Sequence, residues 1–266
     1  MPLSEAGATP IHYERSGTGP PVLYCNGSGA TLASARPILE RLSESFDVVG
    51  FDFRGMGRTP LSDSPYSMAD LAADIAGLLD HLEWDRCRLA GLSFGGMVAQ
   101  EFAVTFPDRV ERLALLSTSP GGGLPSYPLE ELADLSPHDR ATRSLLLADR
   151  RWTSDWLGEH PEEFQIVMSL AEGAPAEESD DQRAGRLAQL EARRGHDVMD
   201  RLGSVTAPTW VGCGTYDDIA PIVNAEAIVQ RIADAELHVF DGGHLFLFQD
   251  DHAWPELLTF LHTDEQ

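Results

Sequence analysis

The chain has 266 residues, 42% of them hydrophobic, and a formal net charge of −24 at pH 7. All 19 of its basic residues are arginine, so reactions that need a catalytic lysine, such as Schiff-base chemistry, are excluded. The strong negative charge argues against nucleic acid as a partner, because phosphate backbones would be repelled. No apolar run approaches the roughly 18 residues of a membrane helix, so no membrane partner is expected.

The N-terminus and the cysteines indicate where the protein works. Residues 1–17 have no basic start followed by an apolar block, so we expect no signal peptide and a cytoplasmic location. Cys25, Cys87 and Cys213 are odd in number and far apart, and no C-x-x-C pair occurs. This pattern predicts free thiols and argues against a zinc site or a disulfide framework. We therefore expect no metal.

From residue 21 onward, short apolar runs alternate with amphipathic stretches. The runs typical of buried strands are residues 21–25, 46–52, 87–91 and 112–118. The stretches typical of helices are residues 33–45, 67–82 and 96–106. The clearest helix begins at Ser67, a typical N-cap residue. Continuous apolar strands that alternate with helices predict an α/β fold with a mostly parallel sheet and helices on both faces.

This alternation stops at the glycine- and proline-rich segment 119–128. From there to about residue 203 the patterns are helical, without a convincing strand: 145–157, 161–171 and 181–194. The alternation then returns with strands at 208–214 and 236–240, a helix at 223–233 and a last helix within 246–262. We therefore predict a core domain formed by residues 1–119 and 204–266, interrupted by a helical insertion at residues 120–203.

A serine between two glycines follows the predicted strand 87–91. Ser93 lies in the stretch Gly91-Leu-Ser93-Phe-Gly95, and the predicted helix 96–106 begins directly after it. Such a strand–turn–helix corner strains the serine backbone and requires small residues two positions before and after. The turn also points backbone N–H groups to where an oxyanion would bind. The alternative is an ordinary glycine-rich turn with a serine cap; the partners described next favour a nucleophile.

A serine nucleophile needs a base, usually a histidine, and an acid that orients it. Of the nine histidines only His244 follows a strand end, in the sequence FDGGH, where two glycines allow a loop to reach over the sheet. The alternative is a surface loop histidine. Asp217 and Asp218 both follow the predicted strand 208–214, at the sheet edge where α/β proteins place their sites. The residues alone leave the choice between these two carboxylates open.

The chain resembles the α/β-hydrolase superfamily over essentially its whole length, with the order Ser, Asp, His along the chain. Five segments carry the resemblance: CNGSGA (25–30), DFRGMGRT (52–59), GLSFGG (91–96), GTYDDIAP (214–221) and GGH (242–244). The family's small esterases, 3-oxoadipate enol-lactonases and cofactor-free haloperoxidases are the most similar branches. The resemblance implies a sheet of about eight strands, with a helical cap inserted between the sixth and seventh.

The resemblance also implies roles for individual residues. Its spacing at the acid makes Asp217 the third member of the triad and leaves Asp218 as a turn residue. The backbone N–H groups of Ser28 and Phe94 would form the oxyanion hole. Asn26 stands where the family usually has a histidine, a departure that changes the oxyanion loop but leaves Ser93 in place. No cofactor is implied. The chain has G-x-G pairs at residues 17–19, 27–29 and 55–57, but none of them is followed by the third glycine of a dinucleotide-binding loop.

The substrate is the least determined part of the prediction. Besides Asn26, the apolar residues Met97, Trp152, Met199 and Leu245 are candidates for the substrate pocket, although they are equally typical of ordinary core. We predict a serine hydrolase that cleaves an ester or lactone of a small, largely apolar molecule, as a monomer or homodimer. The alternatives are a C–C bond hydrolase or a cofactor-free haloperoxidase or perhydrolase with the same triad. A ligand-binding protein without catalysis is the alternative of another class.

Overall fold

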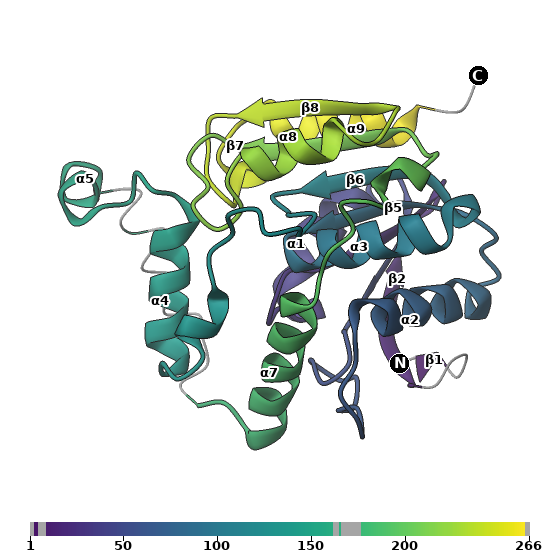
Figure 1. Cartoon of the computed structure of the whole chain (residues 1–266), viewed down its shortest axis with the longest axis horizontal. Helices are drawn as coiled ribbons and strands as arrows, with labels where there is room; N and C mark the ends of the chain where they lie inside the picture. The colour runs from purple at the N-terminus through teal and green to yellow at the C-terminus, as the bar shows by residue number, and fades with distance from the viewer. Residues whose placement is uncertain (1–2, 5–8, 162–164, 166–176, 264–266) are drawn as a thin grey trace.

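A computed structural model of the chain describes residues 3–4, 9–161, 165 and 177–263. Its centre is one sheet of eight strands in the order β1-β2-β4-β3-β5-β6-β7-β8 (Figure 1). The strands are Leu3–Ser4 (β1), Ile11–Ser16 (β2), Pro21–Cys25 (β3), Asp47–Phe51 (β4), Cys87–Leu92 (β5), Val110–Leu116 (β6), Thr209–Gly214 (β7) and Ala235–Phe240 (β8). Strands β3 to β8 pair in parallel, whereas β1 and β2 are antiparallel to their neighbours. The predicted α/β fold with a mostly parallel sheet is confirmed.

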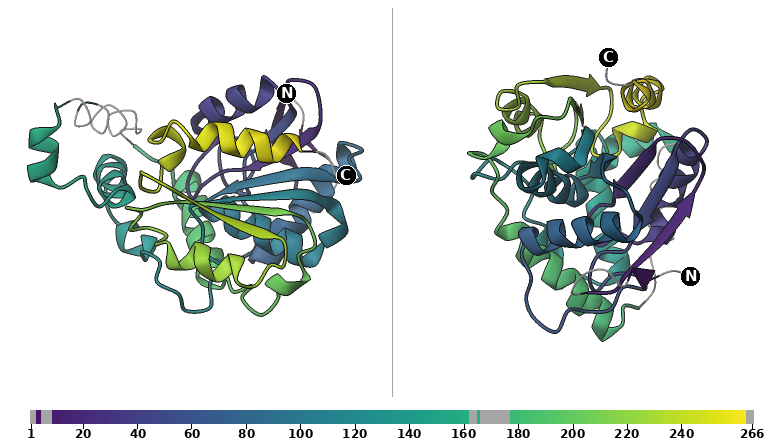
Figure 2. Two further views of the ribbon diagram at one scale, coloured as in Figure 1. Left: turned by 90° about the horizontal axis from the view of Figure 1, so that it is seen from above. Right: turned by 90° about the vertical axis from the view of Figure 1, so that its right-hand side faces the viewer.

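Helices cover both faces of the sheet (Figure 2). The helices α1 (Leu32–Ser43) and α9 (Ala253–His262) bury their apolar residues on one face. The helices α2 (Met68–His81), α3 (Phe94–Thr105) and α8 (Val223–Val229) do so on the other. As predicted, Ser67 caps α2: its hydroxyl accepts the N–H of Asp70. The central strand β5 is buried from Cys87 to Gly91, because both of its faces are covered by helices.

In the described part of the segment between β6 and β7, all regular elements are helices, joined by turns and loops. The segment contains η2 (Leu129–Leu132), α4 (Pro137–Ala148), α5 (Ser154–Glu159), α7 (Asp180–Arg194) and η3 (Leu202–Ser204). The insertion therefore lies between the sixth and seventh strands, as predicted. The division into core and cap near residues 120 and 203 stays an interpretation of this order. No helix in the described ranges is long and apolar enough to cross a membrane.

One predicted helix of the insertion is wrong. We expected residues 145–157 to form a single helix, but α4 ends at Ala148 and α5 begins at Ser154. The break occurs because Asp149 is extended, and its buried carboxylate accepts the backbone N–H of Arg151. Thr153 then caps α5. The predicted helix 181–194 is confirmed as α7, whereas most of the predicted helix 161–171 lies outside the described residues.

Helix α7 packs directly on the core. A Cβ atom on Gly185 would overlap the backbone of Gly55, so only a glycine allows this close approach. Ala192 at the other end of α7 belongs to the main hydrophobic core. Just beyond the helix, the ring Nε2 of the buried His196 lies 3.2 Å from the carbonyl oxygen of Ser119. Burial lowers the pKa of His196 to about 4, so the ring is neutral when the protein is folded.

Candidate active site

Ser93 occupies a strained turn between β5 and α3. Its φ of 54° and ψ of −115° are a conformation that a residue with a side chain adopts at a cost of about 1–3 kcal/mol. The surrounding structure maintains this conformation: the Ser93 N–H donates to Leu116 O at 2.8 Å, and Thr118 Oγ1 donates to Ser93 O at 2.7 Å. A Cβ atom on Gly91 would lie 2.5 Å from Gly95 O. The two glycines that flank Ser93 are therefore required by sterics, as the sequence predicts.

The predicted acid and base are hydrogen-bonded to each other. His244 Nδ1 lies 2.7 Å from Asp217 Oδ2, and the Asp217 side chain is fully buried. The other oxygen of Asp217 accepts the N–H groups of Ile219 at 2.8 Å and Ala220 at 2.9 Å. Because an ionised carboxylate only accepts, the proton lies on Nδ1 of His244, and Nε2 is left free to act as a base.

Asp218 has a different environment from Asp217. Its side chain is 47% exposed, and its nearest cationic partner is Arg150, at 3.8 Å. The two neighbouring carboxylates therefore separate into a buried one on the histidine and a solvated one at the turn. The structure places Asp217, the residue that the family spacing indicates, next to His244.

Three residues hold the His244 loop, and we call them the clamp: Ala148 and Asp149, which are about 95 positions away in sequence, and the nearby Gln249. The backbone N–H of His244 donates to Ala148 O at 2.5 Å. Gln249 Oε1 accepts the N–H of Gly243 at 2.8 Å, while Gln249 Nε2 donates to Asp149 Oδ2 at 2.9 Å. Asp149 is completely buried. The sequence analysis missed the clamp, because no local pattern links residues that are 100 positions apart.

The loop after β3 borders the nucleophile. A Cβ atom placed on Gly27 would lie 3.9 Å from Ser93 Cβ. Asn26 shapes this loop from within: its Oδ1 accepts the N–H of Gly27 at 2.9 Å, and its Nδ2 donates to Thr31 O at 3.0 Å. The asparagine therefore supports the loop through hydrogen bonds, and its place in the substrate pocket stays a prediction. The function of the Ser28 N–H in this loop, and that of the Phe94 N–H, as oxyanion donors stays a prediction.

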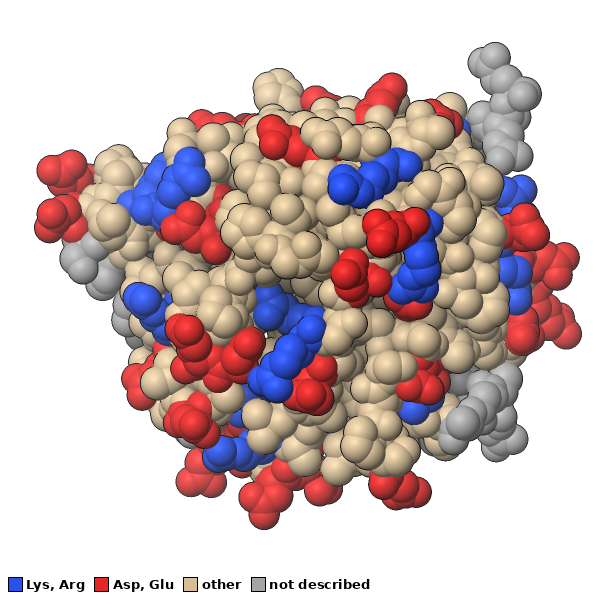
Figure 3. All heavy atoms as spheres, viewed as in Figure 1, with Lys and Arg blue, Asp and Glu red and all other residues tan. Residues whose placement is uncertain are grey.

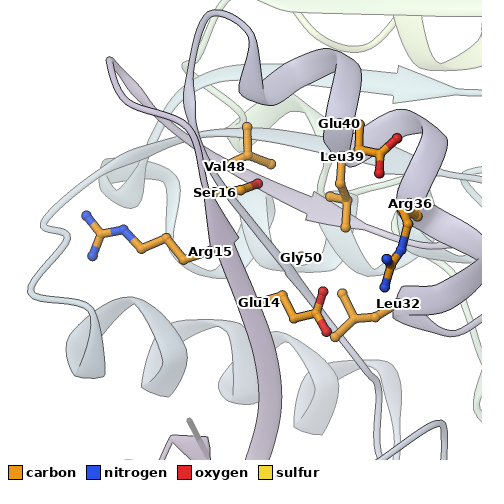
Figure 4. A pocket seen from close by; sticks show the side chains of 9 residues that line it. All are labelled: Glu14, Arg15, Ser16, Leu32, Arg36, Leu39, Glu40, Val48 and Gly50. Carbon is orange, nitrogen blue, oxygen red and sulfur yellow. The ribbon is translucent and has the colours of Figure 1, made fainter. Parts of the chain in front are cut away.

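The four apolar pocket candidates lie in different surroundings. Met97 belongs to the main core, and Trp152 packs in a small cluster with Leu157 of the insertion and Ile219 of the loop after β7. Met199 lies against Gly122, where an added Cβ would touch its side chain, and the half-buried Leu245 directly follows His244. A cavity of about 200 Å³ lies elsewhere, between β2, β4 and α1 (Figure 4), and none of the candidates lines it.

Ser93, Asp217 and His244 follow strands β5, β7 and β8, so all three lie at the carboxyl edge of the sheet. In the described structure the Ser93 hydroxyl makes no hydrogen bond, and the contact from His244 to Ser93 stays a prediction. Burial raises the pKa of Cys87 and Cys213 to about 12, which makes these thiols poor nucleophiles. Over the described ranges, no three His, Cys, Asp or Glu side chains gather where a metal would bind.

Comparisons with known proteins show similarity over nearly the whole chain. A family model described as alpha/beta hydrolase fold matches residues 20–251. The poly(3-hydroxyalkanoate) depolymerase of Ectopseudomonas oleovorans is 30% identical over 250 residues, which cover 92% of this chain and 86% of that protein. The 2-hydroxy-6-oxo-2,4-heptadienoate hydrolase of Pseudomonas putida is 29% identical over 252 residues, covering 88% and 86%. The crystal structure of the enol-lactonase from Burkholderia xenovorans superposes with a TM-score of 0.79 at 25% identity, covering 98% of this chain and 100% of that one.

Proposed function

Because this chain belongs to the alpha/beta hydrolase fold family, we propose that it is a serine hydrolase with Ser93 as nucleophile, His244 as base and Asp217 as acid. Its substrate in this proposal is a carboxylic ester or lactone of a small, largely apolar molecule. The observation that supports the proposal most is the 2.7 Å hydrogen bond between His244 Nδ1 and the buried Asp217 carboxylate. This bond prepares the opposite ring nitrogen to take a proton.

The proposed reaction proceeds in two halves. Ser93 Oγ attacks the carbonyl carbon while His244 Nε2 takes its proton, and the carbonyl oxygen becomes an oxyanion held by the N–H groups of Ser28 and Phe94. His244 then gives the proton to the leaving alcohol, and an acyl-enzyme remains. Water, deprotonated by His244, releases the acid and restores Ser93. The negative Asp217 stabilises the imidazolium that forms in both halves.

The names of the relatives support ester or lactone hydrolysis, since they include a depolymerase of a hydroxyalkanoate polymer and an enol-lactonase. A second candidate, hydrolysis of a C–C bond beside a carbonyl, is supported by the heptadienoate hydrolase at 29% identity. The triad fits either reaction, because each begins with attack of an oxygen nucleophile on a carbonyl carbon. Ligand binding without turnover is the third possibility to be tested.

A panel of esters, lactones and a 2-hydroxy-6-oxo-dienoate separates these functions. We expect the wild-type protein to turn over esters or lactones repeatedly and Ser93→Ala to lose at least about 10³-fold in rate while remaining folded. Turnover of the dienoate alone would favour the C–C hydrolase. Labelling by a fluorophosphonate without turnover of any compound would indicate a binding protein. A Ser93→Ala variant with the wild-type rate would refute the proposal.

We also propose that the enzyme acts on a small molecule in the cytoplasm, as a monomer or homodimer. The three cysteines are unpaired and buried, which is typical of proteins in reducing compartments. Size-exclusion chromatography with light scattering would determine the oligomeric state, and cell fractionation would determine the location. A tetramer or larger assembly, or recovery outside the cytoplasm, would contradict this part of the proposal.

A further inference from the structure

Two buried side chains of α7 lie against the loop that borders Ser93, and each has a hydrogen-bond donor that finds no partner among the described residues. They are Arg186 and Gln189, whose residue exposures are 7% and 0%. Their spacing of three residues places them on the same side of the helix. In Figure 1, α7 runs beside the core below α3. Neither residue was a site candidate in the sequence analysis.

Gln189 is fixed by the oxyanion loop itself. Its Oε1 accepts the backbone N–H of Gly29 at 2.9 Å, one residue after the predicted oxyanion donor Ser28. This bond determines the orientation of the amide, because the flipped form would bring two donors together. Nε2 is therefore held beside the loop as a donor, and it has no partner in the described structure.

Arg186 is also held in a single orientation. Its Nε and Nη2 atoms each lie 2.9 Å from an oxygen of Glu178, and Nη2 also donates to Ala133 O. The side chain passes over the loop, with Cδ 3.9 Å from where a Cβ on Gly29 would be. The remaining nitrogen, Nη1, is buried and makes no hydrogen bond with the described residues. A guanidinium held this firmly is well suited to a fixed acceptor.

The charges around Arg186 leave an excess of one positive charge. Glu178 is shared, because Arg140 also lies 3.2 Å from its Oε1. Burial lowers the pKa of Arg140, and the nearby positive charge of Arg186 adds to the effect. Arg183 pairs separately with the exposed Asp134. Arginine and acidic side chains are interspersed over the face shown in Figure 3, while the net charge of the chain is −24. A surplus of arginine around Glu178 therefore runs against the overall charge of the protein.

These side chains lie against the loop that borders the proposed nucleophile. Gly27 and Gly29 belong to this one short loop: a Cβ on Gly27 would lie 3.9 Å from Ser93 Cβ, the Gly29 N–H donates to Gln189, and a Cβ on Gly29 would lie 3.9 Å from Arg186 Cδ. A buried donor without a partner is destabilising, and a negatively charged acceptor would satisfy both donors and balance the surplus positive charge at once. Carboxylate oxygens meet this need and match the geometry of guanidinium and amide donors.

We propose that Arg186 and Gln189 form a subsite for a carboxylate on the substrate, with Arg186 Nη1 and Gln189 Nε2 as the donors. The inference rests on the proposed function and narrows it. The substrate becomes an ester or lactone that carries a carboxylate on the part of the molecule near the oxyanion loop. Gln189 also links the subsite to catalysis, because the same amide supports Gly29.

The test compares 4-nitrophenyl half-esters of succinic, glutaric and adipic acid with the corresponding methyl 4-nitrophenyl diesters, which lack the negative charge. We expect the wild-type protein to prefer at least one half-ester over its diester in kcat/KM. Gln189→Glu keeps an acceptor for the Gly29 N–H but replaces the Nε2 donor by an oxygen. It should lower the half-ester to diester ratio of kcat/KM by about 10- to 100-fold, mainly through KM.

Arg186→Lys keeps the charge opposite Glu178 but removes the branched donor, and we expect it to lower the same ratio by about tenfold. Arg183→Gln is the matched control: it removes an exposed arginine on the same helix and should leave the ratio unchanged. The proposal is refuted if the wild-type protein shows no half-ester preference. Equal losses on both esters in the two variants would also refute it, since they indicate a purely structural role.

Binding to Ser93→Ala keeps this test independent of catalysis. Isothermal titration calorimetry with the monomethyl ester and the dimethyl ester of glutaric acid should show tighter binding of the charged compound. The added change Gln189→Glu should abolish this preference. If no ester is hydrolysed but the charged compound still binds selectively, the proposed function fails and the carboxylate subsite stands. If turnover is found without selective binding of any carboxylate, the subsite fails and the hydrolase stands.

Discussion

The two adjacent carboxylates after β7 offer the sharpest test of the proposed triad. In Asp217→Asn the side chain keeps its size, but one of its two acceptor oxygens becomes an NH2 group. The remaining oxygen cannot serve both His244 Nδ1 and the N–H groups of Ile219 and Ala220, which the carboxylate serves together. If the oxygen faces the two backbone donors, the NH2 group faces His244. The proton of the ring then moves to Nε2, where it blocks the base.

The magnitude follows from that change of tautomer. The equivalent change in serine proteases lowers kcat by about 10⁴, and the same buried geometry leads us to expect a loss of this order for Asp217→Asn. Asp218→Asn is the matched control, because it changes the same charge one residue away. The Asp218 side chain is 47% exposed and 3.8 Å from Arg150, so we expect a loss of less than about tenfold.

The assay is kcat of the two variants on one ester near pH 8, with folding checked by circular dichroism and thermal melting. Hydroxide assists deprotonation at high pH, so a partial recovery of Asp217→Asn above pH 9 would agree with a tautomer effect. Similar rates for the two variants would show that the Asp217–His244 hydrogen bond has no catalytic role. The reverse ranking would assign the acid to Asp218.

Three further predictions concern the insertion and stability. Asp149→Asn should lower kcat about tenfold, because the clamp on the His244 loop loosens. Asp241→Asn is the control: Asp241 is an exposed partner of Arg151, and its substitution should change kcat less than about twofold. Equal effects of the two substitutions on kcat would contradict a role of the clamp. Trp152→Ala should change the ranking of bulky esters more than the rate on an acetate ester; loss of all activity in a folded variant would point to a catalytic group in the insertion. His196 has a pKa of about 4 when folded and about 6.5 when unfolded, so the unfolded chain binds the proton first as the pH falls. The free energy of unfolding therefore falls between about pH 6.5 and 4, by up to about 3 kcal/mol. Urea unfolding of the wild-type protein and of His196→Gln at pH 7.5 and 4.5 should show a larger loss for the wild type. Parallel losses would disprove the contribution of His196.

Features of the site were predictable from the sequence where the residues that form them are close together in the chain. Gly91 and Gly95 are two residues from Ser93, so a strained turn can be recognised without knowing the fold. Strand β2 was missed, because only the first half of IHYERS is fully buried and the strand lies near the sheet edge. Its charged residues resemble a loop.

Contacts between distant segments were beyond prediction. Gln189 and Gly29 are 160 positions apart, and Asp149 and Gln249 are 100 apart. Each contact joins polar groups that would be solvated if the segments were not packed together. The buried Asp149 also ended a helix that apolar periodicity extends through residue 157. A pattern of side chains along one segment contains no information about a partner that only the fold supplies.

The clamp has a consequence for recombination between related hydrolases. At the end of α4, Ala148 O accepts the His244 N–H and Asp149 accepts a hydrogen bond from Gln249. These residues of the insertion therefore help to hold the loop that carries the catalytic histidine in the proposed triad. A foreign insertion spliced in at the ends of β6 and β7 would remove these contacts together with the substrate-facing residues. A chimera would then lose histidine alignment and substrate preference at once. A splice junction placed after residue 151 would retain the clamp while exchanging Trp152 and the rest of the insertion, so the retained stub would remain part of the catalytic unit.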